Sequence, residues 1–86
     1  MTLRLTTHTV STDTDDGAVL LSRRTGAYWQ LNQTGAYALQ RLLDGHTLDE
    51  VAEEFAAHFG IEAAEAQQDL TALTDQLRSS GLVEAR

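Results

Sequence analysis

The chain has 86 residues and a formal net charge of -7 at neutral pH. It contains no cysteine, which excludes disulfides, a thiolate nucleophile and zinc–thiolate sites. The start, Met1–Val10, alternates polar and apolar side chains and lacks the apolar core of a signal peptide, and no apolar run approaches the roughly 20 residues that span a bilayer. These features favour one cytoplasmic domain with a modest core.

The negative charge is concentrated in the second half of the chain. Acidic and basic residues balance up to His46, whereas nine acidic residues from Thr47 onward are accompanied only by Arg78 and Arg86. Binding nucleic acid through that half would need cations to neutralise phosphates, so the charge disfavours it. The acidic surface either serves solubility alone or also selects a basic partner.

Three strands are predicted before the first helix. Leu3–Val10 alternates like a strand, Ser11–Gly17 has the composition of a turn, and Ala18–Arg23 and Ala27–Leu31 are the second and third strands. Consecutive strands joined by short loops usually pair in order, so we expect an antiparallel meander. The third strand then lies at an edge and leaves one row of backbone N–H and C=O groups unpaired, which proteins either blunt or use.

The third predicted strand has two different faces. Trp29 should share one face with Ala27 and Leu31 and pack on the core, because side chains alternate along a strand. Tyr28 and Gln30 take the other face. We expect this edge strand to be the working surface of the protein.

Three helices are predicted after the strands. Asn32 can cap a helix over Gln33–Leu43, because its side-chain oxygen accepts an N–H of the first turn. Thr47 and Glu50 form a capping box for the second helix, which ends before Gly60.

The third and longest helix is predicted from Glu62 to about Ser80. Gly81 ends it, and Leu82 and Val83 should fold back onto the core. The apolar positions expected on one face of each helix are Ala36, Tyr37, Leu39, Leu42 and Leu43 in the first, Leu48, Val51, Ala52, Phe55 and Phe59 in the second, and Ala66, Leu70, Leu73 and Leu77 in the third.

The sequence gives little support for catalysis. His8, His46 and His58 lack the short spacing of metal ligands, and no cysteine accompanies them. No nucleophile motif is present, and the glycines form no phosphate-binding loop. We therefore expect a protein that is not an enzyme and has no catalytic residues, metal or cofactor.

Asp69 stands directly before Leu70, at the border of the apolar face of the third predicted helix. It is either a solvated helix residue or a carboxylate at the rim of a groove. In the second case it would accept a hydrogen bond, or a Lys or Arg side chain, from a bound peptide.

Several sparse motifs occur together in one order along the chain. They are Tyr28-Trp29-Gln30-Leu31-Asn32-Gln33-Thr34-Gly35-Ala36, Leu42-Leu43-Asp44-Gly45, Thr47, Val51, Asp69-Leu70, Leu73, Leu77 and Gly81-Leu82-Val83. Over roughly Ala18–Val83 this pattern resembles the PqqD-like family, the recognition elements (RREs) of ribosomally made, post-translationally modified peptides (RiPPs). The extended start and the lack of a fused domain are most similar to the free-standing recognition protein of lasso peptide biosynthesis.

The resemblance implies an α+β fold of winged helix-turn-helix-like type, with a three-stranded antiparallel sheet followed by three helices in one peptide-recognition domain over residues 1–86. The leader segment of a precursor peptide would add as a strand to the third strand, in a cleft beside the third helix. The implied peptide-binding residues are Ala27, Tyr28, Trp29, Gln30, Leu31, Asp69, Leu70, Leu73, Gln76 and Leu77. A separate cysteine peptidase would then remove the leader before a cyclase closes the ring.

Affinity and specificity for such a leader would have different sources. Each main-chain hydrogen bond to an added strand nets only about 0.5–1.5 kcal/mol and does not depend on the leader's side chains. An apolar wall of Leu70, Leu73 and Leu77 would take an aromatic, Pro or Leu side chain, and Asp69 would favour a leader with Lys or Arg.

Three alternatives stay open at this point. The family could serve another pathway, with a radical-SAM or other modifying enzyme as client. A winged-helix DNA-binding regulator has a compatible order of helices, but its recognition helix would be acidic here. An acidic scaffold that tethers two enzymes would not bind the isolated leader. No nucleic acid or membrane partner is expected, and the oligomeric state is left undecided because an exposed edge can also pair with its own copy.

Overall fold

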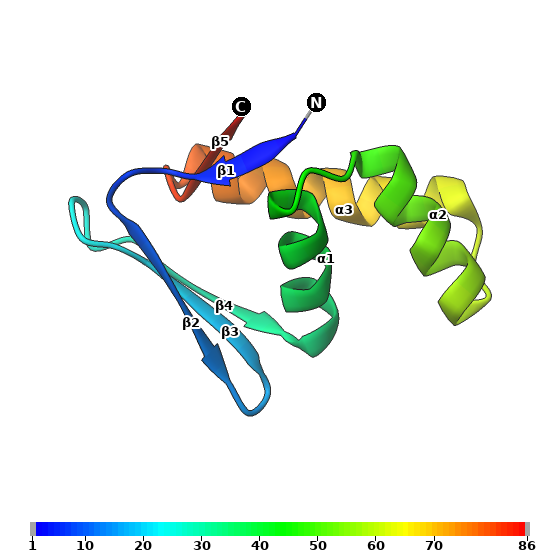
Figure 1. Cartoon of the computed structure of the whole chain (residues 1–86), viewed down its shortest axis with the longest axis horizontal. Helices are drawn as coiled ribbons and strands as arrows, with labels where there is room; N and C mark the ends of the chain where they lie inside the picture. The colour runs from blue at the N-terminus through cyan, green and yellow to red at the C-terminus, as the bar shows by residue number, and fades with distance from the viewer. Residues whose placement is uncertain (1, 86) are drawn as a thin grey trace.

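The computed structural model describes residues 2–85, arranged as shown in Figure 1. In chain order its elements are β1 (Leu3–Leu5), β2 (Thr9–Thr14), β3 (Gly17–Ser22), β4 (Tyr28–Asn32), α1 (Gln33–Leu43), α2 (Leu48–Phe59), α3 (Ala63–Ser79) and β5 (Val83–Ala85). Strands β2, β3 and β4 form an antiparallel sheet in that order. The predicted fold, a three-stranded antiparallel sheet followed by three helices, is therefore confirmed.

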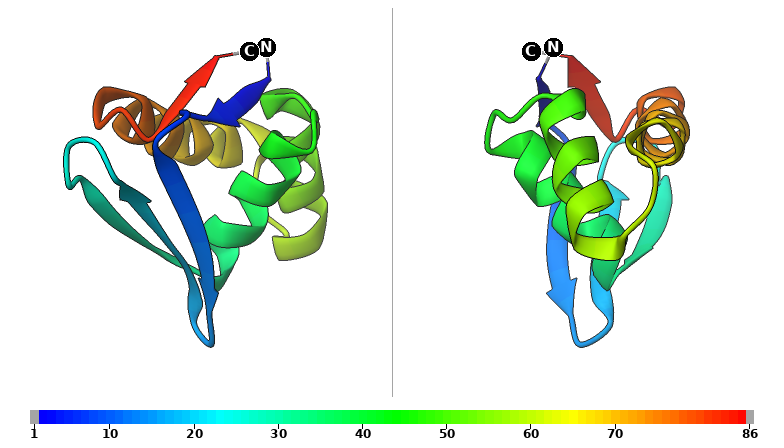
Figure 2. Two further views of the ribbon diagram at one scale, coloured as in Figure 1. Left: turned by 60° about the vertical axis from the view of Figure 1, so that its left-hand side comes forward. Right: turned by 90° about the vertical axis from the view of Figure 1, so that its right-hand side faces the viewer.

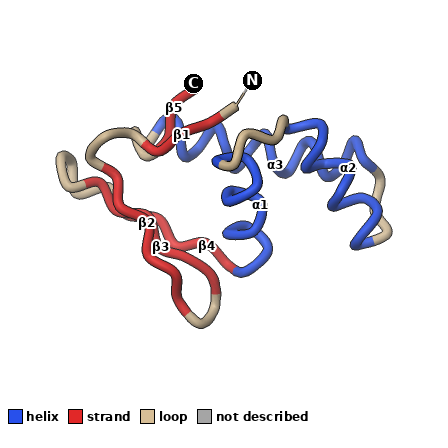
Figure 3. The backbone as a smooth tube through the Cα atoms, in the orientation of Figure 1, coloured by secondary structure: helices blue, strands red, loops and turns tan. Residues whose placement is uncertain are grey.

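Helix α1 connects the sheet to the other two helices. It contacts β3 and β4 on one side and α2 on the other, while α2 packs along α3. Figure 3 shows the result: the three-stranded sheet lies at one side of the molecule and α2 lies at the other, with α1 between them, while α3 runs across the top of the view from α2 to β5.

The first predicted strand, Leu3–Val10, is wrong as a single element. Its beginning, β1, pairs with β5, and only its end belongs to β2. Thr6 bends the chain between them, because its N–H donates to the carbonyl of Leu82 at 3.1 Å and its hydroxyl donates to that of Gly81 at 2.8 Å. The carbonyl of Thr6 in turn accepts from the N–H of Thr9 at 2.9 Å.

The predicted turn over Ser11–Gly17 is too long. Strand β2 continues to Thr14, which pairs with Gly17, so only Asp15 and Asp16 form the turn. The threonines of this stretch are β-branched and favour a strand. The Ser, Asp and Gly residues around them favour a turn, and the prediction gave these more weight.

The predicted helix ends agree closely with the structure. The Asn32 side chain accepts from the N–H of Gly35 at 2.8 Å, and Thr47 and Glu50 form the expected capping box. Gly60, in the left-handed conformation at φ 68°, follows α2. The third helix begins one residue later than predicted, with Glu62 at its N-cap.

A continuous hydrophobic core joins the sheet to all three helices. Leu82 and Val83 belong to it, so the predicted return of the chain onto the core is confirmed. The pairing of β1 with β5 brings the two ends of the described chain together, as both views of Figure 2 show. The buried residues of this core are Leu3, Leu20, Leu31, Ala38, Leu39, Leu42, Val51, Ala52, Phe55, Ala66, Leu70, Leu77, Leu82 and Val83.

Two aromatic residues that the helical pattern grouped with the core are exposed. Tyr37 on α1 retains 54% of its surface and Phe59 on α2 retains 51%. Both border an open cavity between α1 and α2 instead of the core. For these two side chains the prediction of a packed face is wrong.

Candidate functional site

Strand β4 is an edge of the three-stranded sheet. Its inner side pairs with β3 from Tyr28 to Asn32, and within residues 2–85 no strand pairs with its outer side. A strand edge of this kind can accept a further strand through main-chain hydrogen bonds alone.

The register decides which backbone groups of β4 face outward. The N–H of Ser22 donates to the carbonyl of Ala27 at 2.8 Å, so Ala27 faces β3. Residues of an antiparallel pair alternate between facing the partner strand and facing away from it. Trp29 therefore exchanges its hydrogen bonds with β3, whereas the N–H and C=O groups of Tyr28 and Gln30 point to the free edge.

The side chains of β4 alternate as the sequence predicts. Leu31 is buried, and Trp29 and Ala27 are half-buried and pack against the core. Tyr28 and Gln30 are exposed on the other face. The residues whose backbone is free at the edge are thus the ones whose side chains contribute least to the core.

Helix α3 lies on the same side of the molecule as β4, as the right-hand view of Figure 2 shows. Asp69, Leu73 and Gln76 are spaced four and three residues apart, so they lie on one flank of this helix. The opposite flank, with Thr71 and Arg78, borders a cavity lined by residues of β1, α1 and α2. The flank with Asp69 is therefore the one turned away from α2.

The leucines of α3 do not contribute equally to its surface. Leu70 and Leu77 are 4% and 0% exposed and belong to the core, whereas Leu73 is half-buried. Of the apolar wall expected from the sequence, only Leu73 reaches the surface. The remaining surface of this flank is polar, formed by the exposed side chains of Asp69 and Gln76.

The charge on this flank is negative. Glu65 and Asp69 are both exposed and stand one helical turn apart. The carboxylate of Asp69 has no hydrogen-bond or ion-pair partner within the part of the chain that the structure describes. A ligand with a Lys or Arg side chain could therefore pair with this carboxylate.

The histidines do not form a metal site. No group of three or more His, Cys, Asp or Glu side chains among residues 2–85 is arranged to hold a metal ion. In the same part of the chain, no helix combines the length and the apolar character needed to cross a bilayer.

Comparisons with known proteins add to this geometry. A family model described as coenzyme PQQ synthesis protein D (PqqD) matches residues 17–83, more than three quarters of the chain. The chain belongs to the PqqD family. The motif-based resemblance is thereby confirmed, and the matched segment contains both β4 and α3.

Two solved structures are similar to this PqqD family member over almost its whole length. One, described as lasso peptide synthetase B1 complexed with the leader peptide, has 39% sequence identity and a TM-score of 0.92, covering 99% of this chain and 100% of that chain. The other, TbiB1 in complex with the TbiA(beta) leader peptide, has 25% identity and a TM-score of 0.85, covering 96% of each chain. No curated protein matches the chain.

Proposed function

We propose that this protein binds the leader segment of a ribosomally made precursor peptide by strand addition to β4, and presents it to a separate leader peptidase in lasso peptide biosynthesis. The observation that carries the proposal is the free edge of β4, where the backbone groups of Tyr28 and Gln30 point away from the sheet. Two similar proteins are described as complexes with leader peptides, which supports the same ligand here.

The two faces of an added strand would meet different surroundings. Side chains on its inner face would lie toward Trp29 and the flank of α3 with Leu73 and Asp69, and those on its outer face would lie beside Tyr28 and Gln30. Each main-chain hydrogen bond contributes about 0.5–1.5 kcal/mol of binding free energy. The entropic cost of ordering the leader largely offsets the sum of these contributions. Selection must then come from the inner face, where Leu73 offers an apolar contact and Asp69 a negative charge.

The protein acts in this proposal as a single, non-catalytic, cytoplasmic domain. Peptide cleavage would be the task of a separate cysteine peptidase, because the chain has no cysteine of its own, and a cyclase would act afterwards. The proposed contacts of the leader are the backbone of β4 and the side chains of Trp29, Asp69, Leu73 and Gln76, with Leu70 and Leu77 supporting this flank from the core.

Gln30→Pro is the sharpest test of strand addition. Proline removes the N–H of residue 30, which faces the free edge, so leader affinity should fall by about 1 kcal/mol or more while β4 stays paired with β3. Affinity is measured by titration calorimetry with a synthetic leader peptide, and folding by circular dichroism.

Ser11→Pro is the matched control for that variant. The N–H of Arg23 donates to the carbonyl of His8, so by the same alternation the backbone of Ser11 faces outward at the opposite edge, on β2. Ser11→Pro should leave leader affinity unchanged. Equal affinities of the two variants for the leader would refute binding at β4.

A second client pathway is favoured by one observation, the description of the matching family as a coenzyme PQQ synthesis protein. In that case a radical-SAM or other modifying enzyme would replace the lasso peptidase. Titrating the protein with a lasso leader and with a leader from another pathway distinguishes these two pathways. Specific binding of the second leader alone would mean that the protein serves the modifying enzyme and not the lasso peptidase.

A further inference from the structure

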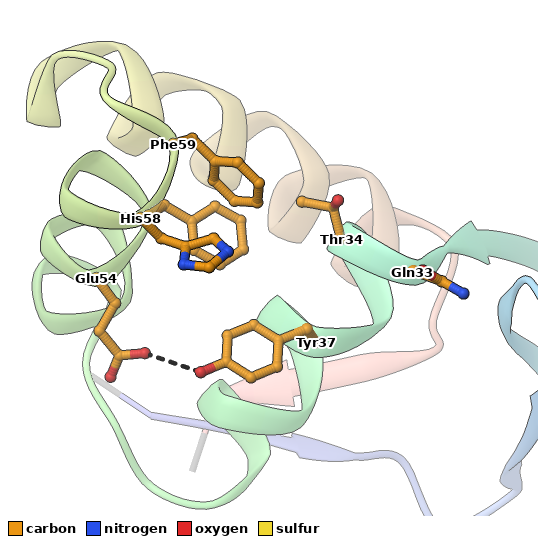
Figure 4. Close-up of a pocket in the computed structure, with 7 residues that line it drawn as sticks. Gln33, Thr34, Tyr37, Glu54, His58 and Phe59 are labelled. Carbon is orange, nitrogen blue, oxygen red and sulfur yellow. Dashed lines mark hydrogen bonds between the residues drawn. The ribbon is translucent and has the colours of Figure 1, made fainter.

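An open cavity of about 470 Å³ lies between α1 and α2 (Figure 4). Its walls are mainly aromatic, from Tyr37 on α1 and from Phe55 and Phe59 on α2, with Glu54 and His58 at its border. A water molecule occupies about 30 Å³ in the liquid, so the cavity has room for whole side chains.

The aromatic side chains form one connected surface. The rings of Tyr37 and Phe55 are stacked with centroids 6.1 Å apart, and Phe59 meets Phe55 edge-on at 5.4 Å and the ring of His58 at 4.7 Å. We call the surface formed by Tyr37, Phe55 and Phe59 the aromatic groove. Tyr37 and Phe59 each leave about half of their surface uncovered, and exposed aromatic residues of this kind are enriched where proteins bind one another.

The groove is held in shape without a ligand. Arg41 donates to Glu54 at 2.7 Å across the gap between the helices, and the hydroxyl of Tyr37 donates to the same carboxylate at 3.4 Å. Figure 4 shows this second bond at the rim of the cavity. A surface that is already ordered loses little conformational entropy when it binds, which favours affinity.

Negative charge lies at the end of the groove nearest the sheet. The side-chain amide of Gln33, which lines the cavity, donates to the backbone carbonyl of Asp15 at 3.2 Å. That bond joins the turn that contains the exposed residues Asp15 and Asp16 to Gln33, the first residue of α1, at this end of the cavity. Arg41, one helical turn after Tyr37 on α1, is already paired with Glu54. The groove therefore complements a ligand that is both apolar and positively charged.

We propose that the aromatic groove docks a basic, apolar segment of a second protein, one that acts on the peptide held at β4. The inference rests on the proposed function for the existence of such a protein. An apolar side chain of the segment enters between Tyr37 and Phe59, and its Lys or Arg side chains meet Asp15 and Asp16. Because Gln33 follows β4 directly, a protein docked here lies next to one end of a strand bound at that edge.

The test uses the purified leader peptidase of the proposed pathway as the probe. Phe59→Ser should weaken its binding by about tenfold or more, whereas affinity for the leader peptide should stay within about twofold. Leu21→Ser is the matched control: it removes a similarly exposed apolar side chain, 42% accessible, from the outer face of the sheet. This control should leave both affinities unchanged, and melting temperatures establish that each variant is folded.

A second variant tests the charge without touching the helices. Asp15→Asn combined with Asp16→Asn keeps the turn chemistry and removes two negative charges. Its affinity for the peptidase should be lower than that of the wild type at low salt and should depend less on salt concentration. Salt dependence equal to that of the wild type would contradict the electrostatic part of the proposal.

Other occupants of the groove give different results. If Phe59→Ser binds the peptidase as the wild type does, or if the wild type does not bind it at all, the inference is overturned, although leader binding at β4 still stands. If Phe59→Ser loses leader affinity, the leader itself occupies the groove. If the wild type forms a dimer that Phe59→Ser abolishes, a second copy occupies it. If the wild type fails to bind the leader, the proposed function is what fails.

Discussion

The guanidinium of Arg41 on α1 donates two hydrogen bonds to the carboxylate of Glu54 on α2, with Nη2–Oε1 and Nε–Oε2 distances of 2.7 and 3.3 Å. This contact holds the pKa of Glu54 below its ordinary value, and the Tyr37 hydroxyl acts in the same direction. A carboxylate whose pKa falls on folding stabilises the native state above its unfolded pKa of about 4.3. That contribution is lost as the pH falls through the lower native pKa.

Glu54→Gln should therefore lower the melting temperature at neutral pH and reduce the further loss that acid causes between about pH 5 and pH 3. Part of the acid sensitivity should persist, because the Thr47 N–H also lowers the pKa of Glu50 at the start of α2. Thermal unfolding followed by circular dichroism across this range measures both effects. Glu53→Gln, at an exposed position of the same helix, is the control, and identical pH profiles for the two variants would contradict the assignment.

Gly17→Ala should destabilise the fold strongly. A Cβ at this position, where φ is 152°, would clash with the carbonyl oxygen of Leu31 and lie 2.6 Å from the carbonyl carbon of Asn32. Backbone atoms cannot move aside as a side chain can, so we expect a loss of about 3 kcal/mol or more, at the upper end of overpacking. Gly26→Ala, with φ at 78° and open space around it, carries only the left-handed strain of about 1–2 kcal/mol. Equal losses in urea unfolding would rule out the close approach.

Leu31→Ala and Tyr28→Ala test the two faces of β4. Leu31 is 5% exposed in the core, so its truncation should cost about 2–5 kcal/mol of unfolding free energy. Tyr28 is 59% exposed on the other face, and its truncation should change stability by no more than about 0.5 kcal/mol. Denaturant titration measures both. A larger loss for Tyr28→Ala would mean that the faces are reversed.

Local sequence signals predicted the helices well because the interactions that end a helix are local. The cap at Asn32, the capping box of Thr47 with Glu50, and Gly60 all act within one turn of the chain. The pairing of β1 with β5 joins residues at opposite ends of the sequence. No local pattern contains that information, so the alternation of Leu3–Val10 predicts a single strand.

The sequence predicts which side chains of the candidate site share a face. It does not predict which backbone groups are free or which of those side chains reach the surface. Alternation along β4 placed Trp29 and Leu31 inward, but which backbone groups are free depends on the register with β3, which the loop before Ala27 sets. The apolar stripe of α3 likewise gave one helical face. Only the packed structure separates Leu70, in the core, from Leu73, at the surface.

Asp69→Ala should weaken leader binding by about 1–3 kcal/mol if its carboxylate accepts a charge-assisted hydrogen bond from the leader. The effect should shrink at high salt, because the residue is exposed and its charge is screened there. Asp75→Ala removes the same charge from a different flank of α3, where Asp75 lines a cavity with Thr71, and should leave affinity unchanged. Titration calorimetry with the leader, and with a leader whose Lys and Arg are replaced by Gln, measures the coupling between the two partners. If Asp69→Ala and Asp75→Ala bind the leader equally well, Asp69 is only a solvated helix residue.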